Sequence, residues 1–168
     1  GRTITGVQAG SNSLHKEGFI AKEDCSCGFI RVPLGNIEYL KKEINANTAA
    51  IFFEPIQGEA GVIVPSDGYL SGVRKLCDKY NVLFIADEVQ TGIARTGKLL
   101  ATDYEDARPD ILVLGKALSG GVFPVSAVLA DNEIMMCIKP GEHGSTYGGN
   151  PLANKVAVAA LEVIKHER

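Results

Sequence analysis

Two short apolar runs, each followed closely by an ionisable residue, constrain the fold of this chain more than any other feature. Val82–Ala86 is rich in branched and aromatic residues and stops at Asp87. Ile111–Leu114 is followed, after one glycine, by Lys116. Such runs are typical of parallel strands buried on both faces. Because open α/β sheets bind ligands at the carboxyl ends of their strands, the pattern predicts a site containing a carboxylate and an amine.

This pair of residues suggests a specific chemistry. A lysine at the end of an apolar strand is costly unless it is paired, deprotonated or used covalently. A lysine amine can form a Schiff base with an aldehyde cofactor, and pyridoxal phosphate also needs an acid facing its ring nitrogen. We expect Lys116 to take the first role and Asp87 the second. The alternative is that Asp87 caps a turn and Lys116 is a solvated residue beyond a strand.

The rest of the chain alternates helix and strand patterns, which predicts an α/β fold with a mostly parallel sheet flanked by helices. We expect helices over residues 36–44 and 68–80, a strand over 49–53, and a long final helix capped by Asn150. The apolar stripe of the second helix contains Leu70, Val73, Leu76, Cys77 and Tyr80. Residues 1–28 form the least regular part of the chain.

Two loops add candidate polar groups. Residues 54–61 follow the strand over 49–53 and place Glu54 and Glu59 at the same end of the sheet as Asp87 and Lys116. Residues 143–149 combine small residues with the hydroxyls of Ser145 and Thr146, so a phosphate is a plausible occupant. The alternative for this second loop is a turn whose glycines only relieve strain.

Composition narrows the classes of partner. The 168 residues fit one domain, and the net charge of −3 provides no basic stripe for nucleic acid. No apolar run is long enough for a membrane helix. Four cysteines occur at 25, 27, 77 and 137, without zinc-site spacing. We therefore expect no nucleic acid, membrane or structural metal as a partner.

Several motifs resemble the class III pyridoxal-phosphate aminotransferases. They are DEVQTG at 87–92, RTG at 95–97, LGKALSGG at 114–121 and PGEHGSTYGGNP at 140–151. Within that class, the last motif and GKALSGG at 115–121 are most similar to the members that act on ornithine. The match runs over nearly the whole chain from Ala49, whereas residues 11–28 match poorly.

The resemblance implies a fold and a reaction. Residues 1–168 would be part of the large, cofactor-binding domain of fold type I, which is aspartate aminotransferase-like, without its amino-terminal segment and small carboxyl-terminal domain. The isolated chain is then expected to be inactive or nearly so. The reaction would move the terminal amine of L-ornithine to 2-oxoglutarate in a homodimeric enzyme of the cytoplasm or mitochondrial matrix. Acetylornithine and 4-aminobutyrate remain alternative amino donors.

The resemblance also assigns roles to further residues. Val89 would lie against the cofactor ring, Gln90 would donate to the ring hydroxyl, and Ser145 and Thr146 would reach the cofactor phosphate of the partner subunit.

For the substrate, Arg2 would bind the α-carboxylate through two parallel hydrogen bonds. Glu54 would hold active-site groups in place, and Glu59 would pair with an arginine that swings aside for the second substrate.

Two other functions stay open on the residues alone. Residues 92–98 match most of a phosphate-binding P-loop, which would suggest a nucleotide hydrolase. Against it, Leu99 stands where a magnesium-binding Ser or Thr is required, and the acidic strand comes before the loop. A non-catalytic α/β scaffold is the third possibility.

Overall fold

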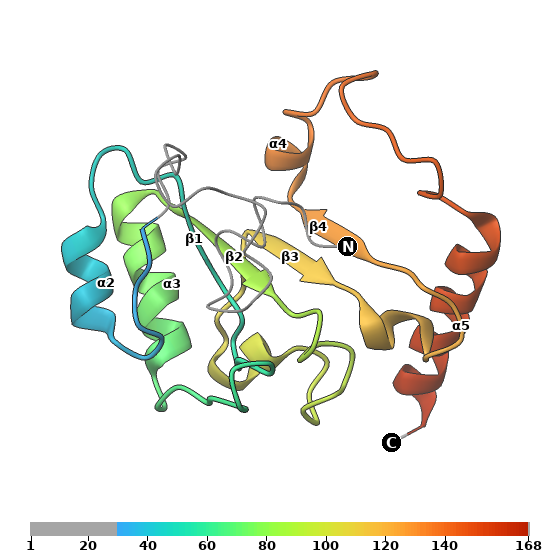
Figure 1. The fold of residues 1–168 in the computed structure, drawn as a ribbon, viewed down its shortest axis with the longest axis horizontal. Helices are drawn as coiled ribbons and strands as arrows, with labels where there is room; N and C mark the ends of the chain where they lie inside the picture. The colour runs from blue at the N-terminus through green and yellow to red at the C-terminus, as the bar shows by residue number, and fades with distance from the viewer. Residues whose placement is uncertain (1–29, 168) are drawn as a thin grey trace.

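The computed structural model describes residues 30–167, and its centre is a four-stranded sheet (Figure 1). The strands follow one another across the sheet in chain order: β1 (Ala50–Phe53), β2 (Leu83–Asp87), β3 (Ile111–Leu114) and β4 (Ala127–Ala130). β1, β2 and β3 are parallel, and β4 runs antiparallel to β3. The predicted mostly parallel sheet is confirmed.

Helices cover the sheet and its ends. The α-helices are α2 (Ile37–Glu43), α3 (Tyr69–Tyr80), α4 (Asn132–Met135) and α5 (Pro151–His166), and the 3-10 helices are η2 (Ala101–Glu105) and η3 (Lys116–Ser119). In Figure 1, α2 and α3 lie together near β1 and β2, while α5 lies beyond β4 and packs on η3. In the part of the chain that the structure describes, no helix is long and apolar enough to cross a membrane.

Asparagine caps explain where two helices begin. Asn36 Oδ1 accepts the backbone N–H of Tyr39 at 2.9 Å at the start of α2. Asn150 Oδ1 accepts from Leu152 N at 2.9 Å and Ala153 N at 3.2 Å, ahead of α5 with Pro151 in its first turn. These bonds satisfy donors that the first helical turn leaves unpaired. The predicted helix starts are confirmed.

The main core lies between α3 and the sheet. Phe84, Val73 and Cys77 are fully buried there, and the rings of Phe53 and Phe84 stack with centroids 5.2 Å apart. Burial of these side chains supplies the main driving force that holds α3 on β2. One residue of the predicted apolar stripe is not buried in this core: Tyr80, at the end of α3, is 40% exposed.

A smaller core positions η3, the helix that begins at Lys116. Ile93, Leu114 and Leu118 are buried in it, and Ala157 and Ile164 of α5 pack against it. A Cβ on Gly120, just after η3, would lie 3.4 Å from Ala160 Cβ of α5. The end of β3 is therefore held between the loop after β2 and α5.

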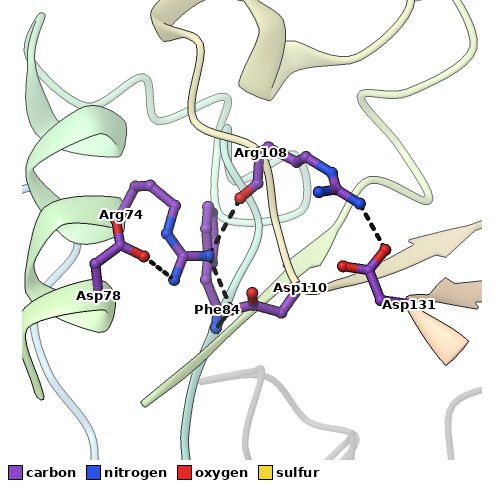
Figure 2. Close-up of polar contacts among 6 residues, drawn as sticks. All are labelled: Arg74, Asp78, Phe84, Arg108, Asp110 and Asp131. Atoms are coloured by element: carbon purple, nitrogen blue, oxygen red, sulfur yellow. Dashed lines mark hydrogen bonds and ion pairs between the residues drawn. The ribbon is translucent and has the colours of Figure 1, made fainter. Parts of the chain in front are cut away.

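An ionic cluster fixes the opposite, amino end of the sheet (Figure 2). Arg74 of α3 bonds Asp110 at 2.8 Å and Asp78 at 2.8 Å. Asp110 Oδ2 also accepts the backbone N–H of Phe84 at 2.7 Å. Although burial lowers the pKa of the Arg74 guanidinium, these two aspartates outweigh that effect and raise it. The cluster ties α3, β2 and the start of β3 together, away from the edge where Asp87 and Lys116 lie.

Candidate active site

The carboxyl ends of β2 and β3 lie side by side, as the sequence predicted. Asp87 is the last residue of β2 and pairs in register with Val113 of β3. The next backbone N–H, that of Glu88, donates to Val113 O at 2.9 Å, so the pairing continues one residue beyond the strand. Lys116 follows three residues after Val113. Asp87 and Lys116 therefore lie at or just beyond the carboxyl ends of neighbouring strands, at the same end of the sheet.

The Asp87 side chain is buried, and only one of its two carboxylate oxygens accepts a hydrogen bond within the described residues. Its relative exposure is 9%. Oδ1 accepts the backbone N–H of Val89 at 3.1 Å, which fixes the carboxylate against its own loop. Among the residues that the structure describes, Oδ2 accepts no hydrogen bond. A buried acid with a free oxygen is suited to bind a cationic or N–H-bearing group.

The loop after β2 touches the residue before Lys116. A Cβ built on Gly115 would lie 3.3 Å from Val89 Cγ1 and 3.8 Å from Ser126 Cβ. The first distance is tighter than an ordinary carbon contact, so a glycine suits this close approach. Val89 thus approaches the residue before Lys116 with its side chain and bonds the Asp87 carboxylate with its backbone N–H.

Lys116 itself has an unusual backbone. Its φ of 39° lies in the left-handed region, where a side chain other than glycine's is disfavoured. The residue is exposed, and within the described chain its amine has neither a hydrogen bond nor an ion pair. Strained conformations of this kind cluster at functional sites. Lys116 therefore presents a free amine on a strained turn.

The loop after β1 is held in place by its own hydrogen bonds. Gln57 and Ile63 form a two-way backbone bridge, with N–O distances of 3.0 and 2.9 Å. Pro55 is fully buried, and Glu54 Oε2 accepts the backbone N–H of Gly58 at 3.4 Å. Glu54 is half-buried and Glu59 is exposed at the turn.

Two predicted site residues from different loops meet directly. Gln90 Nε2 donates to Glu59 Oε1 at 3.2 Å. Gly58 makes room for this contact, because a Cβ there would lie 2.4 Å from Gln90 Oε1. The loops that follow β1 and β2 are therefore joined by a side-chain hydrogen bond.

Other predicted residues are not brought to this edge. Ser145 and Thr146 lie in the exposed stretch 141–149, and the segment between α4 and α5 loops away from the sheet in Figure 1. Ser145 Oγ accepts the backbone N–H of Gly148 at 3.0 Å. Arg2 lies outside the described residues, as do Cys25 and Cys27.

The buried position of Glu88 was not predicted from the sequence. Its side chain is 1% exposed and accepts hydrogen bonds from the Thr91 hydroxyl and from the backbone N–H groups of Ala101, at 3.0 Å, and Thr102, at 2.8 Å. One signal was present: an acid at the end of an apolar strand with a threonine three residues later. The partners 13 and 14 residues away had no visible signature.

The P-loop interpretation does not fit the structure. A P-loop leads into an α-helix whose first turn binds phosphate. Here the stretch 92–98 is a turn with left-handed Ile93 and Ala94, and a five-residue 3-10 helix, η2, comes next.

Comparison with known proteins finds relatives that match most or all of this chain. The mitochondrial ornithine aminotransferase of Drosophila melanogaster is 60% identical over 169 residues, which are 100% of this chain and 38% of that relative. The ornithine aminotransferase of Toxoplasma gondii, crystallised with partial occupancy of PLP at its active site, has a TM-score of 0.89 and 48% identity, over 98% of this chain and 38% of that one. The acetylornithine aminotransferase of Elizabethkingia anophelis has a TM-score of 0.80 and 64% identity, over 82% of this chain and 35% of that one.

This chain thus spans less than two fifths of the length of these three proteins. The family model "Aminotransferase class-III" matches residues 1–168. Because that match includes every residue, and because the predicted acid and amine follow the carboxyl ends of adjacent strands, the chain belongs to the class III aminotransferase family.

Proposed function

We propose that this chain serves the transfer of the terminal amino group of L-ornithine to 2-oxoglutarate, which yields glutamate semialdehyde and glutamate. The observation that carries the proposal is that adjacent parallel strands present Asp87 and Lys116 at one edge of the sheet. The likeness to the Drosophila and Toxoplasma ornithine aminotransferases supports the choice of amino donor.

Pyridoxal 5′-phosphate is the proposed cofactor, as in other class III aminotransferases. It supplies an aldehyde that condenses with amines and a ring that withdraws electrons from the reacting carbon. The residues fit this group, because Asp87 keeps one oxygen free and the Lys116 amine is unpaired within the described chain. An acid for the ring nitrogen and an amine for the aldehyde are both available.

Four residues act on the cofactor of their own subunit in this proposal. Lys116 Nζ holds it covalently and later, as a free amine, moves a proton at the reacting carbon. Asp87 Oδ2 accepts the N–H of the ring and keeps the ring electron-poor. Val89 packs on the ring face, and Gln90 donates to the ring hydroxyl.

Three residues act on the substrates. Arg2 binds the α-carboxylate in a bidentate fashion. Glu54 holds groups of the site in place, which suits its bond to the Gly58 backbone. Glu59 is the acid that changes partner between the two half-reactions, and its present partner is Gln90.

The first test is Lys116→Ala in the full-length enzyme loaded with pyridoxal phosphate, with Lys155→Ala of exposed α5 as the matched control. Borohydride reduction should fix the cofactor to the Lys116 peptide in the wild type and in the control. Lys116→Ala should lose this adduct and at least about a thousandfold in turnover, because it lacks the proton-transferring amine. Appreciable turnover by Lys116→Ala would refute the assignment.

A mixed-dimer experiment tests the proposed role of Ser145 and Thr146 in the partner subunit. Lys116→Ala and Thr146→Ala homodimers are each expected to be impaired. If phosphate binding comes from the partner, a hybrid of the two variants contains one site with both residues intact. Mixing should then restore activity. If Thr146 instead serves its own subunit, no intact site forms and the hybrids stay impaired.

Acetylornithine is the second candidate amino donor, because the Elizabethkingia acetylornithine aminotransferase is 64% identical to this chain. The specificity ratio decides between the two. We expect kcat/KM for L-ornithine to exceed that for N-acetylornithine by at least about tenfold, an amount that one lost ionic contact can produce. The reverse ratio would favour the second candidate.

A further inference from the structure

Glu88 is hydrogen-bonded to three segments near the candidate active site. Its side chain accepts from the Thr91 hydroxyl and from Ala101 N, at 3.0 Å, and Thr102 N, at 2.8 Å, at the start of η2. Its backbone N–H donates to Val113 O of β3 at 2.9 Å. Glu88 is therefore bonded to its own loop, to η2 and to the strand that leads to Lys116.

Because the Glu88 carboxylate is buried, it requires these hydrogen bonds. Glu88 is 1% exposed, and a carboxylate removed from water is costly unless donors surround it. Its donors belong to residues that are themselves buried: Ala101 at 2%, Thr102 at 1% and Thr91 at 5% exposure. A shift of the Glu88 carboxylate would leave several buried polar groups without partners, so its position is tightly fixed.

Glu88 and its neighbours face different surroundings. Successive residues of an extended strand point to opposite faces, and the pairing of β2 continues through Glu88, so the Asp87 and Glu88 side chains project to opposite sides. Val89 approaches Gly115, and its N–H is bonded to Asp87 Oδ1. Gly92 completes the turn, where a Cβ would lie 2.8 Å from Glu88 O. Because Glu88 stands between Asp87 and Val89 and its own backbone is bonded to β3 and to this turn, fixing Glu88 restricts the positions of both neighbours.

We propose that Glu88 is a positioning residue for the cofactor site: its buried hydrogen bonds set the orientation of the Asp87 carboxylate and of Val89. The inference rests on the proposed function, since it assumes that these two residues face pyridoxal phosphate. It adds a residue that touches neither cofactor nor substrate and acts through the segment 87–89. A purely structural role would instead make Glu88 matter for folding alone.

The test measures cofactor binding by the apo-protein together with stability. Glu88→Gln keeps the shape but turns an N–H₂ group toward N–H donors. Its dissociation constant for pyridoxal phosphate should rise at least about tenfold, and the pH midpoint of the absorption change of the bound cofactor should move. Asp110→Asn is the matched control, because it alters a carboxylate that accepts a backbone N–H at the other end of β2. It should lower stability without changing either cofactor readout.

Thr91 offers a milder pair of variants if Glu88→Gln does not fold. Thr91→Val removes one donor and should weaken cofactor binding about two- to fivefold, whereas Thr91→Ser keeps the hydroxyl and should bind like the wild type. Equal cofactor binding by wild type and Glu88→Gln, or by wild type and Thr91→Val where only the latter folds, overturns the inference. Equal losses in Glu88→Gln and Asp110→Asn overturn it too. A wild type that binds no pyridoxal phosphate defeats the proposed function itself, and this inference with it.

Discussion

The side-chain amide of Gln90 donates a hydrogen bond to Glu59 Oε1 at 3.2 Å, across 31 residues of sequence. The bond joins the loop that follows β1 to the loop that follows β2. In the proposed reaction, one of these residues contacts the cofactor ring and the other responds to the substrate. Any change in the partner of Glu59 therefore alters a hydrogen bond of the residue proposed to contact the ring.

Gly58→Ala should disturb this pair selectively. The new Cβ would lie 2.4 Å from Gln90 Oε1, so the amide must move, and it can do so because it ends a flexible side chain. We expect the KM for ornithine to rise about three- to tenfold, which is the equivalent of about one ordinary hydrogen bond, with a small change in folding stability. Steady-state kinetics of the cofactor-loaded protein measures this.

Gly72→Ala is the matched control for that experiment. Gly72 lies inside α3, where a Cβ would make only an ordinary contact of 3.4 Å with Ile37 Cδ1. The substitution should stabilise the helix by about 0.5–1 kcal/mol and leave the KM unchanged. If both alanine variants raised the KM equally, the effect could not be assigned to Gln90 and Glu59.

The left-handed backbone of Lys116 leads to a prediction about stability. At a φ of 39°, alanine carries a steric cost that glycine does not. Lys116→Gly should therefore be more stable than Lys116→Ala by about 0.5–1 kcal/mol, after the larger chain entropy of unfolded glycine is subtracted. Chemical denaturation of the two inactive variants provides the comparison. An alanine variant as stable as the glycine variant would show that the turn relaxes and stores no strain.

The strand ends of the site could be predicted because each leaves a local mark in the sequence. β2 and β3 are unbroken apolar runs that stop at ionisable residues, and a parallel sheet aligns their carboxyl ends. The start of α5 was predictable from Asn150 and Pro151 for the same reason, since caps act within one helical turn.

Features that depend on distant partners could not be predicted. Glu88 is buried only because η2 supplies two N–H groups to it, and nothing near Glu88 encodes that fold of the loop. The antiparallel strand β4 was also missed. Its Val128 and Leu129 are 56% and 48% exposed, so an edge position, not an alternating burial pattern, defines the strand.

The ionic cluster in Figure 2 predicts unequal effects for two aspartates that bind the same arginine. Asp110 accepts from both Arg74 and the Phe84 backbone, so Asp110→Asn should cost about 1–3 kcal/mol of stability. Asp78 is 65% exposed, and Asp78→Asn should cost less than about 0.5 kcal/mol. Urea denaturation of both variants measures the difference. Equal losses would mean that the backbone contact of Asp110 contributes nothing.

The thiol of Cys77 predicts a pH dependence of stability above neutrality. Burial raises its pKa from an ordinary 9.0 to about 11, and nearby Arg74 only partly opposes this. The folded protein therefore disfavours the thiolate, while the unfolded chain forms it freely. The resulting stability is complete below about pH 9 and is lost as the pH rises toward about 11.

Cys77→Ala isolates this contribution from the other groups that titrate at high pH. The variant should be less stable than the wild type at pH 8, because it leaves a small cavity beside Val73 and Phe84 in the core under α3. That deficit should shrink between pH 9 and pH 11, since only the wild type then has a thiol that must stay protonated to remain buried. Free energies of unfolding at several pH values give the comparison. Parallel curves for the two proteins would mean that the Cys77 thiol ionises as readily in the core as in the unfolded chain, which its complete burial opposes.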